Sequence, residues 1–140
     1  MKSEPAYIVI DTNVLISAGL LPNSKTALAL ELVVGHFVIA QNKATWHELE
    51  TRITKKKFDP YFGETGRLKH LVKIAQSIQQ FEETASVELS RDATDDKFIA
   101  LAIDAGAKIL ISGDQDLLVL GQYQGIEILS PAGFCERYDL

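Results

Sequence analysis

The 140-residue sequence has a single cysteine and no long apolar run. One cysteine cannot form a disulfide within the chain, so we expect a cytoplasmic setting, with Cys135 packed as a small apolar side chain in a C-terminal helix. No apolar run approaches the ~20 residues that cross a bilayer, and Met1–Pro5 has no apolar signal-peptide region. We therefore expect no membrane partner and one globular domain over residues 1–140.

Basic residues are also scarce, because 14 Lys and Arg face 19 Asp and Glu, for a formal net charge of −5. A protein that merely coats nucleic acid normally has an excess of Lys and Arg, so this balance argues against that class. The aromatic residues are few and spread out, which predicts no base-stacking platform. There is no Cys–His spacing for zinc and no glycine-rich turn after the first predicted strand, so a nucleotide-binding Rossmann protein is disfavoured.

What the sequence does have is an alternation of strand and helix patterns. Tyr7–Ile10 is a run of four β-favouring residues, typical of a central parallel strand buried on both faces. Further strand runs are at 36–40, 108–112 and 126–129, with a looser extended piece at 85–89. Helical patterns are at 14–18, 24–35, 42–53, 64–79, before Gly106 and after Pro131. This order predicts an α/β fold, a three-layer α/β/α sandwich with a mostly parallel central sheet.

Acidic residues follow the predicted strands or begin the helices beside them. Asp11 follows the first strand, and Asp114 and Asp116 follow the strand at 108–112. Asp96 lies near the start of the helix before that strand, and Glu48 lies two turns into the helix after the second strand. The carboxyl ends of parallel strands meet at one edge of a sheet, so we expect these groups to converge there.

Converging carboxylates predict a metal site. They repel one another and take up protons unless a cation lies among them. An oxygen-rich pocket suits Mg²⁺ or Mn²⁺, which accept phosphate oxygens and lower the pKa of an attacking water. The chemistry indicated is metal-dependent phosphodiester hydrolysis.

Each acid also has a purely structural explanation. Asp11 is suited to cap the next helix, Asp114 and Asp116 to follow a turn at Gly113, and Glu48 to form a capping box with Thr45. The prediction of a metal site rests on the set, and Glu50 remains an alternative to Glu48 as the acid of that helix.

Four segments together resemble the PIN-domain nucleases, and most of all the toxins of bacterial and archaeal toxin–antitoxin pairs. They are Asp11-Thr12-Asn13, Glu48, the run 91–98 (RDATDDKF) and the run 112–118 (SGDQDLL). The resemblance spans Tyr7 to about Phe134. It implies a Rossmann-like fold and a Mg²⁺- or Mn²⁺-dependent endoribonuclease. Its principal acids would be Asp11, Glu48, Asp96 and Asp114, with Asp116 as an auxiliary acid and Asn13 and Ser112 as polar supports.

The same resemblance implies an antitoxin partner and a homodimer. The RNA substrate needs basic residues near the acids, and the candidates are Arg52, Lys55, Lys56 and Lys57, although a lysine-rich turn can be merely solvated. Lys97 is expected to contact RNA or to partner a carboxylate. The alternative function is a non-catalytic PIN-like module that binds RNA or protein. An aspartyl phosphatase is disfavoured because Asn13 replaces its second aspartate.

Overall fold

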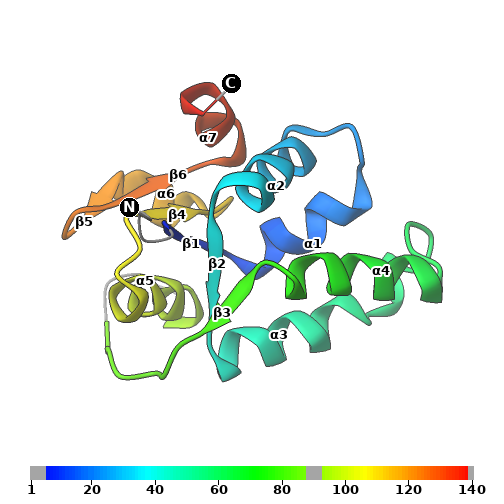
Figure 1. The fold of residues 1–140 in the computed structure, drawn as a ribbon, viewed down its shortest axis with the longest axis horizontal. Helices are drawn as coiled ribbons and strands as arrows, with labels where there is room; N and C mark the ends of the chain where they lie inside the picture. The colour runs from blue at the N-terminus through cyan, green and yellow to red at the C-terminus, as the bar shows by residue number, and fades with distance from the viewer. Residues whose placement is uncertain (1–5, 88–92, 139–140) are drawn as a thin grey trace, which may run out of the picture.

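The computed structural model describes residues 6–87 and 93–138, and in this part of the chain six strands form one sheet. The strand order is β3-β2-β1-β4-β6-β5 (Figure 1). The parallel strands are β1 (Tyr7–Ile10), β2 (Val38–Gln41), β3 (Ile78–Gln80), β4 (Ile109–Ile111) and β6 (Ile126–Leu129). Only β5 (Gln122–Tyr123) is antiparallel, to β6. The predicted mostly parallel sheet is confirmed.

Helices cover both faces of this sheet (Figure 1). In chain order they are α1 (Thr12–Leu20), α2 (Lys25–His36), α3 (Lys43–Ile53), the 3₁₀ helix η1 (Lys56–Phe58), α4 (Glu64–Ala75), α5 (Ala93–Ala105), α6 (Gln115–Leu120) and α7 (Pro131–Arg137). None of the helices in the described residues combines the length and apolar character that crossing a bilayer requires.

Strand β1 divides the core because its side chains alternate between the two faces. Ile8 and Ile10 pack into the cluster under α1 to α4 and α7, whereas Val9 packs with α5 and α6 on the other face. All three are at most 2% exposed. Burying each such side chain contributes roughly 1.5–3 kcal/mol, so β1 is held firmly between the layers. This fixes the position of Asp11, the next residue.

The residues predicted to begin two of the helices do so. Ser24 caps α2, as predicted, and its Oγ accepts a hydrogen bond from the Ala27 backbone N–H at 3.1 Å. Asn42 caps α3 and forms a capping box with Thr45. The expected box between Thr45 and Glu48 is therefore wrong, because Thr45 is itself the third residue of the helix and turns back to Asn42. Glu48 is left without a capping role.

Two other expectations are wrong, and a third is not met over the part of it that the structure describes. The helix predicted for 64–79 ends at Ala75, and Ile78 lies in β3; on α4 itself Leu68 and Val72 are 62% and 46% exposed. The predicted loop around Asp114 and Asp116 is the start of helix α6. Of the extended piece expected at 85–89, residues 85–87 form no strand and residues 88–89 lie outside the described residues.

The inner face of α4 carries His70, which the sequence did not single out. Its Nε2 lies 2.7 Å from the Leu15 carbonyl oxygen, so the ring donates a hydrogen bond from α4 to α1. Burial lowers the pKa of His70, so the imidazole is neutral at pH 7. Gly19 allows this contact, since a Cβ there would lie 2.7 Å from His70 Cδ2.

Candidate active site

Asp11 stands at the carboxyl end of β1 with both carboxylate oxygens held. Oδ1 accepts a hydrogen bond from the Val14 backbone N–H at 2.8 Å and so caps α1. Oδ2 accepts from Ser112 Oγ at 2.6 Å and from the Gly113 N–H at 3.3 Å. The predicted capping role and a role at the sheet edge are therefore compatible. The carboxylate is fixed in direction by the first turn of α1 and by the segment that follows β4.

Asp114 lies close to Asp11, and Ser112 Oγ forms hydrogen bonds with both residues. The Asp114 backbone N–H donates to Ser112 Oγ at 3.0 Å, and the Asp114 carboxylate caps α6 by accepting from the Asp116 N–H at 2.8 Å. Burial raises the pKa of Asp11; the hydrogen bonds from Ser112, Val14 and Gly113 oppose this, and the charge of Asp114 adds to the rise. Two acids at this edge therefore repel each other, as expected of a cation site.

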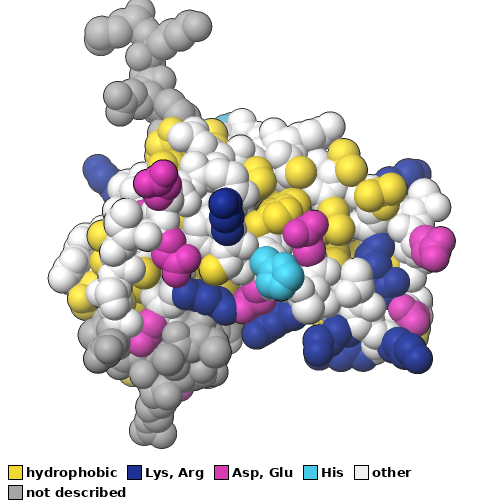
Figure 2. Space-filling model, turned by 90° about the horizontal axis from the view of Figure 1, so that it is seen from below, with side chains coloured by type: hydrophobic (Ala, Val, Ile, Leu, Met, Phe, Trp, Pro, Cys, Tyr) yellow, Lys and Arg dark blue, Asp and Glu magenta, His cyan; other side chains and the backbone are white. Residues whose placement is uncertain are grey.

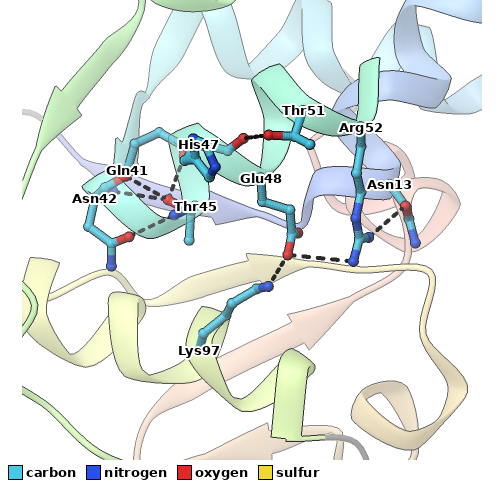
Figure 3. A network of polar contacts seen from close by, with 9 residues as sticks. All are labelled: Asn13, Gln41, Asn42, Thr45, His47, Glu48, Thr51, Arg52 and Lys97. Carbon is cyan, nitrogen blue, oxygen red and sulfur yellow. Dashed lines mark hydrogen bonds and ion pairs between the residues drawn. The ribbon is translucent and has the colours of Figure 1, made fainter. Parts of the chain in front are cut away.

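Helix α3 presents Glu48 and Glu50 to different surroundings. The Glu48 side chain is 12% exposed and points toward α5, where its Oε2 contacts Lys97 Nζ (Figure 3). Its Oε1 is buried and has no hydrogen-bond partner in the described part of the chain. Glu50 is exposed and lines a pocket on another side of α3. Of the two acids, Glu48 is therefore the one turned toward α5, the helix that carries Asp96.

Two basic side chains surround Glu48 (Figure 3). Lys97 reaches it from α5, and Arg52, one turn further along α3, lies 3.5 Å from Glu48 Oε2. Arg52 also donates to Asn13 Oδ1 at 3.4 Å, which connects α3 to α1. Burial lowers the pKa of Lys97. The expectation that Lys97 partners a carboxylate is confirmed, and the carboxylate is Glu48.

The other predicted residues lie on α5, on α6 and beyond the C-terminus of α3. Asp96 is 4% exposed near the start of α5 and adjoins Lys97 in the chain. Asp116 is exposed in the first turn of α6. Lys55, Lys56 and Lys57 lie exposed beyond the C-terminus of α3. Figure 2 shows Lys and Arg side chains gathered at that end of the molecule.

The donor set fits a hard divalent cation in its chemistry. All of the predicted acids offer oxygen, Glu48 Oε1 lacks a donor, and Asp11 is a buried acid next to Asp114. Within residues 6–87 and 93–138, however, no three His, Cys, Asp or Glu side chains are grouped closely enough to hold a metal ion. Lys97 and Arg52 contact the Glu48 carboxylate instead, so a cation that used Glu48 would compete with them.

Sequence reasoning missed the polar cluster at the end of β2. Gln41 and Thr45 are each 1% exposed, and Thr45 Oγ1 donates to Gln41 Oε1 at 2.6 Å (Figure 3). The signal was available, since polar residues directly after an apolar strand also mark Asp11. Here they anchor the start of α3 and thereby set the direction of Glu48.

Comparison with known proteins agrees with this arrangement. Residues 7–116 match the family model of the PIN domain, from β1 to Asp116. An uncharacterized protein of Methanocaldococcus jannaschii, MJ1680, is 30% identical over 122 residues, which are 86% of this chain and 78% of that protein.

Two solved structures share the fold. One is VapBC2 from Rickettsia felis bound to a DNA fragment from its promoter, at a TM-score of 0.60 and 13% identity, covering 89% of this chain and 98% of that one. The other is PAE2754 from Pyrobaculum aerophilum, at a TM-score of 0.52 and 16% identity, covering 96% and 91%. Because the family model matches residues 7–116, which are most of this chain, the chain belongs to the PIN domain family.

Proposed function

We propose that this protein is a metal-dependent endoribonuclease whose centre lies at the carboxyl ends of β1 and β4. The observation that carries the proposal is the buried carboxylate of Asp11, held by Ser112 and Gly113 next to Asp114. Capping a helix requires only one carboxylate oxygen. Here the second oxygen of Asp11 is also held, by Ser112 and Gly113 after β4. Membership of a family made up largely of nucleases supports the same conclusion.

Asp11, Asp96 and Asp114 would hold Mg²⁺ or Mn²⁺, with Asp116 as an auxiliary ligand. When bound, the ion supplies charge stabilisation at phosphorus and acidifies an attacking water. Ser112 keeps the Asp11 carboxylate in position, and Asn13 holds Arg52 near Glu48. Glu48 Oε1 is buried without a donor from the described residues, and it would accept a hydrogen bond from a water once the site opens to admit one.

The basic residues near the C-terminus of α3 would bind the RNA backbone. Arg52 lies at the edge of the acidic site, and Lys55, Lys56 and Lys57 extend the positive charge outward. We infer a toxin of a toxin–antitoxin pair that acts on cytoplasmic RNA, forms a homodimer and is neutralised by an antitoxin. The shared fold with the VapBC2 structure supports this inference.

The test is cleavage of end-labelled single-stranded and structured RNAs in Mn²⁺, in Mg²⁺ and in EDTA. We expect cuts with either metal and none in EDTA. Asp11→Asn runs beside the parent to exclude a contaminating nuclease, and Glu64→Gln, an exposed acid on α4, serves as the matched control. Metal-independent cutting, or equal cutting by Asp11→Asn, would refute the proposal. If the parent cuts nothing yet binds RNA, the non-catalytic module is favoured.

A further inference from the structure

The pocket lined by Glu50, of about 820 Å³, lies between α3 and the segment that follows β3. The α3 residues that line it, Lys43, Trp46, His47 and Glu50, are spaced by three and four and share one helix face. Glu48 is two residues from Glu50, about 200° around the helix, and its side chain points to α5. The pocket is therefore separate from the proposed catalytic centre, across α3.

The pocket is lined by two aromatic residues and by unpaired acids. Trp46 and Phe81 are partly buried residues of its lining. Glu50, Glu82 and Glu83 are exposed, and in the described part of the chain none of the three forms an ion pair. Aromatic residues and free carboxylates thus line the same pocket.

The charge of this space is negative. Three carboxylates stand against Lys43 and the N-terminus of α3, which carries about half a positive charge. A phosphate-bearing ligand would be repelled by this excess. A guanidinium suits it, because its flat face stacks on an aromatic ring and its N–H groups donate to carboxylates.

We propose that this pocket binds an arginine side chain carried by a partner protein. The guanidinium lies against the Trp46 ring and donates to Glu50, Glu82 and Glu83 at the rim. The proposal does not depend on nuclease activity, so it stands or falls separately from the function proposed above.

Trp46 is the only tryptophan of the chain, so one indole N–H resonance reports on the pocket. We would titrate the ¹⁵N-labelled full chain with acetyl-Gly-Arg-Gly-amide in 20 mM salt and follow that resonance. The matched probe replaces arginine by citrulline, which keeps the shape and loses the charge. We expect a saturable shift with the arginine peptide and at least fivefold weaker binding of the citrulline peptide.

Variants test which side chains bind the probe. Glu82→Gln/Glu83→Gln should weaken the arginine peptide about fivefold to twentyfold, while Glu64→Gln/Glu136→Gln, with the same change in net charge at exposed sites elsewhere, should leave it unchanged. Lys43→Gln should tighten binding about twofold, because it removes a like charge.

Three results would overturn the proposal. The first is equal binding of the citrulline and arginine peptides, and the second is no saturable shift with the arginine peptide. The third is binding of guanosine monophosphate in place of the peptide, weakened by Lys43→Gln, which would make the pocket a nucleotide site. Absence of RNA cleavage by the parent, together with saturable binding of the arginine peptide, would refute the nuclease proposal alone.

Discussion

Replacing Lys97 by methionine removes the ammonium from Glu48 and keeps the length of the side chain. Among the described residues, the Glu48 carboxylate, 12% exposed, would then retain Arg52, at 3.5 Å, as its one partner. Breaking a buried pair costs 3–5 kcal/mol, but Lys97 is 26% exposed, so we expect about 2 kcal/mol. For a chain of this length that lowers the melting temperature by about 7 °C.

Two further variants isolate the ion pair. Glu48→Gln/Lys97→Met removes both charges and should melt within about 3 °C of the parent, because no carboxylate is left uncompensated. Lys69→Met replaces an exposed lysine of α4 that has no ion pair among the described residues, and should change little.

The same variant also tests whether a divalent cation binds near Glu48. If a divalent cation uses Glu48, it competes with the Lys97 ammonium in the parent and not in Lys97→Met. A tenfold gain in Mn²⁺ affinity corresponds to about 1.4 kcal/mol, or roughly 5 °C of additional stabilisation by Mn²⁺. Differential scanning fluorimetry with and without Mn²⁺ measures both effects. Equal stabilisation of Lys97→Met and Lys69→Met by Mn²⁺ would refute a role for Glu48 near the metal.

Other substitutions test the supports of the site and of the fold. Ser112→Ala removes the hydroxyl that holds Asp11, and should lower cleavage about 10- to 100-fold in kinetic assays while the melting temperature falls by only a few degrees. Gly19→Ala places a Cβ 2.7 Å from the buried His70 ring, and should cost about 1–3 kcal/mol in urea unfolding; full parental stability would show that the ring can move. The pKa of His70 is lowered in the folded state, so the unfolded chain binds more protons below pH 6.5. Stability should therefore fall as the pH drops from about 6.5 toward 5, with a slope of at most about 1.4 kcal/mol per pH unit from this residue, and His70→Gln should reduce that slope in urea titrations.

The sequence predicted the parts of the fold that local patterns determine. Apolar runs such as Tyr7–Ile10 located the central strands, and Ser24 and Asn42 marked helix starts. Strand β3 was missed because three residues carry too little pattern beside the longer helical stripe of α4. The exposure of Leu68 on that helix depends on which face packs against α1, and this is a tertiary choice that spacing does not encode.

The contacts among the predicted site residues could be anticipated only in part. Parallel topology brings strand ends together, which is why Asp11 and Ser112 could be expected at one edge. The contact between Glu48 and Lys97 joins two helices 49 residues apart, and only the packing of α3 on the sheet determines it. The pocket of Trp46 and Phe81 was missed for the same reason, since the two rings are distant in sequence.

The most direct test of the account is the single-turnover cleavage rate of Asp11→Asn in saturating Mn²⁺, measured against the parent and Glu64→Gln. The account predicts a loss of at least about a thousandfold for Asp11→Asn, because a neutral amide is a poor ligand for a hard cation. Its metal-free melting temperature should stay within a few degrees of that of the parent, because relief of burial and of the Asp114 charge offsets the acceptor oxygen that asparagine lacks. An Asp11→Asn rate within tenfold of the parent would contradict the account and move the chemistry away from this edge of the sheet.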